Sequence, residues 1–117
     1  MNFLARAAAT AAIAFAAGLA LASAPAQVDI AKFAFVPNEV TVAPGTTVVW
    51  VNRDETPHQV ADPGKTFVSP AMDTGDRFEY TFTTEGDFAY FCTLHPFMTG
   101  VVHVRADAAR APDPPPR

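Results

Sequence analysis

The sequence predicts an all-β fold, a Greek-key antiparallel β-sandwich or barrel of seven to eight strands. Short runs of β-branched and aromatic residues recur along the chain, and turn residues such as Pro and Gly separate them. Beyond the N-terminal region, no stretch shows a helical period. Many short strands at this spacing, joined by turns, are typical of sandwiches and barrels.

The N-terminal region precedes this pattern, and residues 1–26 are predicted to form a cleaved signal peptide. Arg6 comes before an Ala-rich apolar run that ends in small residues. This order is typical of secretory signals. We expect cleavage after Ala26, with Ala22 or Ala24 as alternatives. The run is shorter than the roughly 20 apolar residues of a spanning helix. It therefore predicts a periplasmic protein with no stable membrane association.

The first half of the remaining chain contains three expected strands. Residues 28–35 alternate between apolar and polar and close at a turn over residues 37–38. Residues 40–42 form a short run that Pro and Gly end at residues 44–45. Residues 46–52 are almost continuously β-branched or aromatic, which indicates a strong strand.

The second half contains four more expected strands. Residues 59–61 form a short run before a turn, and residues 77–83 alternate between apolar and polar. Residues 88–92 follow a Gly-Asp turn, and residues 100–104 make the final strand. Residues 65–76 show no clear pattern and could form an edge strand or a packed loop.

These runs predict one domain, residues 28–105, followed by a tail. Residues 106–117 are mainly Ala, Asp, Arg and Pro. A segment of this composition has too little apolar surface to pack, so we expect a disordered, Pro-rich tail.

Charge and cysteine content limit the possible functions. The formal net charge is −4, which argues against nucleic acid as a partner because nucleic-acid-binding surfaces are basic. Cys92 is the sole cysteine, so an internal disulfide is impossible. A small exported domain without a disulfide benefits from another source of stability, such as a metal. A lone thiol in an oxidising compartment is also reactive unless it is buried or ligated.

A metal site is indicated by three residues within seven positions: Cys92, His95 and Met98. In blue-copper sites, two His and one Cys form a trigonal plane, with a weak axial Met. His58 is the expected second histidine. His103 is the other candidate, but it alternates with valines in the last strand and should point to solvent or pack locally. We therefore predict one type 1 copper ion bound by His58, Cys92, His95 and Met98.

This donor set predicts an electron carrier and not an enzyme. Single electrons would pass between redox partners through the Cu(I)/Cu(II) couple and leave through the exposed edge of His95. The three histidines of the chain are too few for the additional copper centres of an oxidase or reductase. The alternative is a periplasmic copper chaperone or resistance protein that transfers the ion itself, although Met-rich and His-rich tracts are lacking.

The sequence resembles the cupredoxins over residues 28–105. Its short ligand loop, with Pro96 and Phe97, resembles that of the amicyanins more than the longer loops of plastocyanin, pseudoazurin or azurin. The resemblance implies the same four copper ligands and redox protein partners. An exported dehydrogenase would be the donor and a c-type cytochrome the acceptor, and we expect a monomer. Many relatives have Asn directly after the first His ligand, bonded to the residue after the Cys. Gln59 stands there instead, so this link to Thr93 is not carried over.

Overall fold

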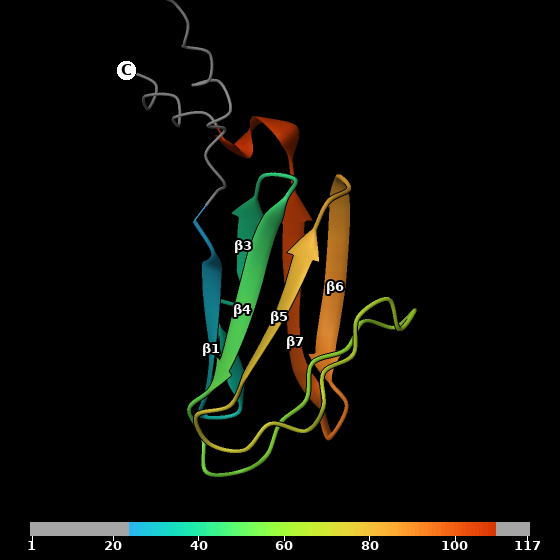
Figure 1. The fold of residues 1–117 in the computed structure, drawn as a ribbon. Coiled ribbons are helices and arrows are strands. Elements are labelled where there is room, and N and C mark those ends of the chain that lie inside the picture. Colours follow the sequence, from blue (N-terminus) through green and yellow to red (C-terminus); the bar gives the residue numbers. More distant parts are fainter. Residues whose placement is uncertain (1–23, 110–117) are drawn as a thin grey trace, which may run out of the picture.

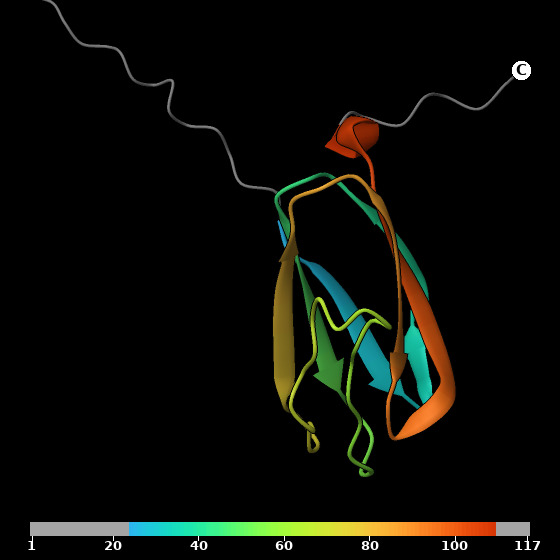
Figure 2. The same cartoon turned by 90° about the vertical axis from the view of Figure 1, so that its right-hand side faces the viewer.

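The computed structural model describes residues 24–109 of the chain. Within this range, seven strands form two facing sheets (Figures 1 and 2), which confirms the predicted all-β sandwich. The strands are β1 Ala26–Ala31, β2 Ala34–Val36, β3 Glu39–Val42, β4 Thr46–Asn52, β5 Arg77–Phe82, β6 Gly86–Cys92 and β7 His95–Val104, and a 3₁₀ helix, η2, covers Ala106–Ala109.

The two sheets have the strand orders β2-β1-β4-β5 and β3-β7-β6. Both are mixed, because β1 runs parallel to β4 and β3 runs parallel to β7. The sequence predicted antiparallel pairing throughout. The chain crosses between the sheets after β2 and again after β3, so strands that are not consecutive become neighbours. A tight hairpin enforces antiparallel pairing, whereas a crossover also allows parallel pairing.

The predicted strand over residues 28–35 is divided into β1 and β2 by a hairpin turn. Lys32 and Phe33 occupy the turn with φ of 53° and 59°. These left-handed conformations are unusual for residues other than Gly, Asn or Asp. The Asp54 carboxylate accepts hydrogen bonds from both turn N–H groups, at 2.7 and 2.9 Å. The sequence pattern missed the turn because the alternation continues through it without a glycine.

The expected strand over residues 59–61 is instead part of a long connection between β4 and β5. His58 and Met72 exchange two backbone hydrogen bonds, of 3.1 and 2.8 Å. Ala61 bridges both Val68 and Phe91. Residues 67–72, within the range that had no readable pattern, therefore pair with residues 58–62. Figure 1 shows this connection at the same end of the sandwich as the turn between β6 and β7, opposite η2.

The first strand and the final 3₁₀ helix both overlap the predicted boundaries of the domain. β1 begins at Ala26, which is also the last residue of the predicted signal peptide, and most of that peptide lies outside the described residues. η2 falls inside the range predicted for the tail, whose residues 110–117 also lie outside them. None of the helical structure within residues 24–109 is long and apolar enough to cross a membrane.

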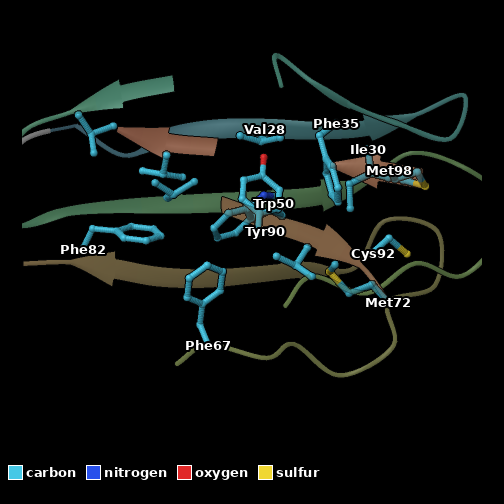
Figure 3. Packing of buried hydrophobic residues seen from close by; sticks show 14 of the residues in the cluster. Val28, Ile30, Phe35, Trp50, Phe67, Met72, Phe82, Tyr90, Cys92 and Met98 are labelled. Atoms are coloured by element: carbon cyan, nitrogen blue, oxygen red, sulfur yellow. The ribbon is translucent and has the colours of Figure 1, made fainter. Parts of the chain in front are cut away.

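The core lies between the sheets and is dominated by aromatic side chains (Figure 3). Trp50 is fully buried and makes an edge contact with Tyr90, with 5.3 Å between ring centroids. Burial raises the pKa of Tyr90 to about 12, so the ring stays neutral in the core. Tyr90 lies against Gly100, its partner on β7. A Cβ on Gly100 would be 2.4 Å from the Tyr90 ring, so only glycine fits there.

Gly100→Ala is therefore expected to destabilise the fold by roughly 1–3 kcal/mol, because the core must shift to admit the methyl group. Gly64→Ala is the matched control, since a Cβ there would be 3.5 Å from its nearest neighbour. Urea unfolding of both variants measures the difference. Equal stabilities would show that the Tyr90 ring moves aside freely.

On the outer face of the second sheet, His103 links three strands. Its Nδ1 is 2.7 Å from Asp87 on β6, and its Nε2 is 2.8 Å from Glu39 on β3. The hydrogen bond to Asp87, and then that to Glu39, raises the pKa of His103. Hydrogen bonds from His103 and then Arg105 lower the pKa of Asp87. The His103 side chain is 27% exposed and hydrogen-bonded to both neighbouring strands, so it packs locally on the sheet, which is one of the two positions expected for it.

These opposite shifts predict a pH window for the contribution of His103 to stability. A raised histidine pKa stabilises the fold below the ordinary value of 6.5, and the effect is lost as pH rises through the folded pKa. Because the Asp87 pKa is lowered, the ionised carboxylate stabilises the fold above pH 3.8. This stabilisation is lost as pH falls through the folded pKa of Asp87. The melting temperature of His103→Asn should therefore fall furthest below that of the unsubstituted protein between these two values. A pH-independent difference would contradict the ionic contribution.

Candidate metal centre

The spacing of Cys92 and His95 is explained by strand pairing. Cys92 ends β6 and His95 begins β7, and the two are cross-strand partners around a turn at Thr93 and Leu94. An irregularity between Phe91 and Cys92 shifts the register there. The sequence predicted a loop before a strand over residues 100–104. Instead, β7 starts at His95, so the imidazole stands on a paired strand.

His58 reaches the same place from the connection between β4 and β5. Its backbone is held by the two hydrogen bonds to Met72, and its side chain is completely buried. Cys92 is also completely buried, whereas His95 is only partly buried. Within residues 24–109, these three side chains form the one cluster of potential metal-binding His, Cys, Asp and Glu groups. His103 lies outside it.

The distances in the cluster fit a three-coordinate plane. The Cys92 sulfur is 3.8 Å from Nδ1 of His58 and 3.7 Å from Nδ1 of His95. Zinc, a metal ion of similar size to copper, binds thiolate at about 2.3 Å and imidazole at about 2.0 Å. At trigonal angles, these lengths separate sulfur from nitrogen by about 3.7 Å. The two Nδ1 atoms and the sulfur can therefore surround one ion.

Met98 supplies the fourth predicted group. It lies on β7, three residues beyond His95, and its side chain is only 2% exposed. Figure 3 shows Met98 and Cys92 at the same end of the core. A buried thioether at this end of the core, together with one thiolate sulfur and two imidazole nitrogens, matches the donor types of blue-copper sites.

Comparison with known proteins agrees with this geometry. A family model described as "Copper binding proteins, plastocyanin/azurin family" matches residues 22–105. The chain belongs to this family. Its metal is copper, and the buried sulfur and two imidazole nitrogens are consistent with one type 1 ion. The resemblance to the cupredoxins stated from the ligand loop is confirmed.

The relatives include amicyanins. The cupredoxin is 38% identical to amicyanin-alpha of Methylorubrum extorquens over 104 residues, 82% of this chain and 87% of the relative. A crystal structure of amicyanin from Paracoccus versutus has a TM-score of 0.66 at 37% identity, covering 69% of this chain and 81% of that one. A copper-containing nitrite reductase from Thermus scotoductus SA-01 has a TM-score of 0.65 at 30% identity. It covers 69% of this chain but only 22% of the reductase.

Asp54 is a site residue that the sequence analysis missed. The Asp54 carboxylate lies 2.8 Å from Nε2 of His58 and is 14% exposed. Burial opposes its ionisation, but hydrogen bonds from the Phe33 and Lys32 N–H groups and from His58 lower its pKa overall. An ionised carboxylate only accepts, so Nε2 carries the proton and Nδ1 keeps its lone pair for a metal. In the sequence, the only indication of this contact is that Asp54 lies four residues before His58.

The sulfur and the ligand loop are held by Gln59. Its backbone N–H donates to the Cys92 sulfur at 3.3 Å, and the Thr93 hydroxyl donates to its side-chain oxygen. The link to Thr93 that the resemblance could not carry over is therefore present in this chain.

Aromatic and aliphatic groups surround the exposed side of the centre. Phe33 makes edge contacts with both His58 and His95, at centroid distances of 5.1 and 5.0 Å. Phe97 is 71% exposed and lies 6.1 Å from the His95 ring, and Leu94 is 50% exposed. His95 therefore reaches the surface inside an apolar rim.

Asp54→Asn is expected to weaken copper binding by about 10- to 100-fold, the range typical when a partner of a metal-binding histidine is lost. An amide oxygen cannot match the charged carboxylate as an acceptor for three N–H groups. Glu55→Gln, at the exposed neighbouring residue, is the matched control because it removes the same charge. Competition with a copper chelator measures both affinities. Equal affinities would assign Asp54 no role in holding His58.

Proposed function

We propose that this cupredoxin is a periplasmic electron carrier with one type 1 copper ion held by His58, Cys92, His95 and Met98. The observation that supports it best is the buried arrangement of one sulfur and two Nδ1 atoms at trigonal distances. The sequence identity of 38% and 40% to two amicyanins supports the same function.

The protein contributes a fixed environment for electron transfer. Copper, when bound, supplies the one-electron Cu(I)/Cu(II) couple. Strand pairing holds Cys92 and His95, and the Asp54 and Met72 hydrogen bonds hold His58. Such anchoring restricts rearrangement between the two oxidation states, which prefer different geometries.

The surface around His95 supports an exit path for the electron. The His95 ring is partly exposed, whereas the Cys92 sulfur is fully buried. The apolar rim of Phe33, Leu94 and Phe97 offers a water-excluding contact to a partner. A partner docked on this rim would place its redox group next to the imidazole edge.

The remaining assignments complete the proposal. The partners would be exported redox proteins, with a dehydrogenase as donor and a c-type cytochrome as acceptor, and the chain would act as a monomer without enzymatic activity. The predicted signal peptide supports the periplasmic location. Cleavage after Ala22 or Ala24 would leave all of β1 in place, whereas cleavage after Ala26 would remove its first residue. The mature domain would cover residues 28–105, followed by the tail.

Burial of the donor atoms favours electron transfer over delivery of the ion. Cys92 is 0% and Met98 2% exposed, so an acceptor protein could not reach either sulfur while the fold is intact. A copper chaperone needs donors that a second protein can contact. Transfer of copper to a copper-free acceptor faster than electron self-exchange would support the alternative.

The decisive test is the absorption spectrum of the Cu(II)-loaded protein with Cys92→Ser. The unsubstituted protein should be intensely blue, because thiolate-to-copper charge transfer gives type 1 sites their colour. Removing the thiolate should abolish that band. His103→Ala is the matched control, since this histidine lies on the outer face of β7, and it should keep the full colour. A colourless, redox-inactive copper adduct of the unsubstituted protein would refute the proposal.

A further inference from the structure

The last described segment of the chain is fixed against the turn between β5 and β6. The Ala106 N–H, at the start of η2, donates to the Glu85 carboxylate at 3.0 Å. The Arg105 guanidinium donates to the Asp87 carboxylate at 2.6 Å. Figure 1 shows η2 and this turn at the same end of the sandwich. The chain therefore continues into residues 110–117 from a point beside the β5–β6 turn.

An aromatic cleft lies next to this turn, on the side of the sandwich where β5 and β6 end their sheets. The cleft has a volume of about 110 Å³. Its walls are the four aromatic side chains of Phe67, Tyr80, Phe82 and Phe88. Neighbouring rings are 4.9 or 5.4 Å apart between centroids. Tyr80 and Phe88 are only partly buried, so apolar ring surface faces solvent here.

The size and the rim of the aromatic cleft limit what it can bind. Pockets for cofactors and drug-sized molecules have volumes of about 300–1,000 Å³, so this cleft is too small for them. It has room for a small ring of a side chain. Thr66, Thr83 and Thr84 line its rim, and their exposed hydroxyls can donate to backbone carbonyls. Aromatic-lined grooves recognise Pro-rich segments, whose carbonyls have no internal partners.

Residues 110–117 have the composition and the charge that suit this cleft. Four of these eight residues are prolines, three of them consecutive at positions 114–116. The segment has two arginines and one aspartate, a net charge of +1, whereas residues 24–109 have five Lys and Arg against eleven Asp and Glu, a net charge of −6. The domain therefore attracts the segment electrostatically.

The segment is also long enough to reach the cleft. Eight residues in a polyproline conformation extend roughly 25 Å. The path back covers at most the four residues of η2, roughly 8 Å at the rise of a 3₁₀ helix. It then follows β6 from Gly86 to Phe88, a further distance of roughly 7 Å. The three consecutive prolines can therefore lie over the aromatic rings.

We propose that residues 110–117 fold back from η2 and bind in the aromatic cleft as a polyproline strap. Proline rings pack against Tyr80 and Phe88, and the threonine hydroxyls of the rim donate to carbonyls of the strap. Within residues 24–109, β5 pairs only with β4, so its outer edge is open to pairing with another chain. The strap covers this side of the sandwich. It binds at the end opposite the copper ligands, so the inference does not depend on the proposed function.

The strap is tested by NMR of the protein with its complete tail, in the metal-free and Cu(I) forms, which are both diamagnetic. The backbone order parameter of Asp113 should be close to the rigid value of about 0.85. Replacing the three prolines at 114–116 by serine should lower it below about 0.6, the range of a free segment. The same replacement should shift the amide signals of Thr84 and Phe88, because the cleft loses its cover.

Two further variants separate the cleft from the tail. Ala111→Ser is the matched control, because it places a serine in the tail and keeps every proline, and it should change neither quantity. Phe88→Leu keeps apolar volume in the cleft but removes one ring, so it should lower the order parameter of Asp113 although the tail is unchanged. A synthetic peptide with the sequence of residues 110–117, added at millimolar concentration to the serine variant, should restore the original Thr84 signal.

Three results would overturn the strap. The first is an Asp113 order parameter below about 0.6 in the unsubstituted protein. The second is a Thr84 signal that does not respond to the loss of the prolines. The third is a Thr84 signal that changes with protein concentration, because the tail would then occupy the cleft of a second copy and not its own.

Discussion

The pairing of Cys92 with His95 across β6 and β7 is the constraint on which the rest of the centre depends. It fixes a sulfur and an imidazole nitrogen 3.7 Å apart around a turn, where two strands already hold the backbone. Because the donors stand on paired strands, their separation is set by sheet geometry and not by the flexibility of a loop. The other groups of the centre have only to approach this fixed pair.

His58 approaches from a segment without regular strands, so it needs a different kind of support. Backbone bonds to Met72 hold its main chain, and Asp54 orients its ring. The same carboxylate satisfies the N–H groups of the turn at Lys32 and Phe33, where both residues have positive φ. One carboxylate thus links the hairpin that carries Phe33, which covers both histidines, to the buried histidine itself.

Features that depend on residues close in the sequence were predicted, whereas features that depend on distant residues were missed. The strand over residues 46–52 was predicted with its limits, because a run of β-branched and aromatic residues identifies a buried strand locally. The turn at Lys32 and Phe33 was missed, because it is stabilised by Asp54, more than 20 positions away. The parallel partners of β1 and β3 were missed for a similar reason. Chain crossings between sheets leave no periodic signal.

The sequence by itself determined the chemistry of this protein. A single Cys, a His three residues later and a Met three residues after that specify a soft donor set for copper, and alternating strands specify the sandwich. Only the tertiary structure decided how the donors are held. Asp54 on His58 and Gln59 between Thr93 and Ser69 are contacts of side chains that look like ordinary polar residues in the sequence. Their roles arise from where the fold places them, because a hydrogen bond requires proximity that residue type alone cannot encode.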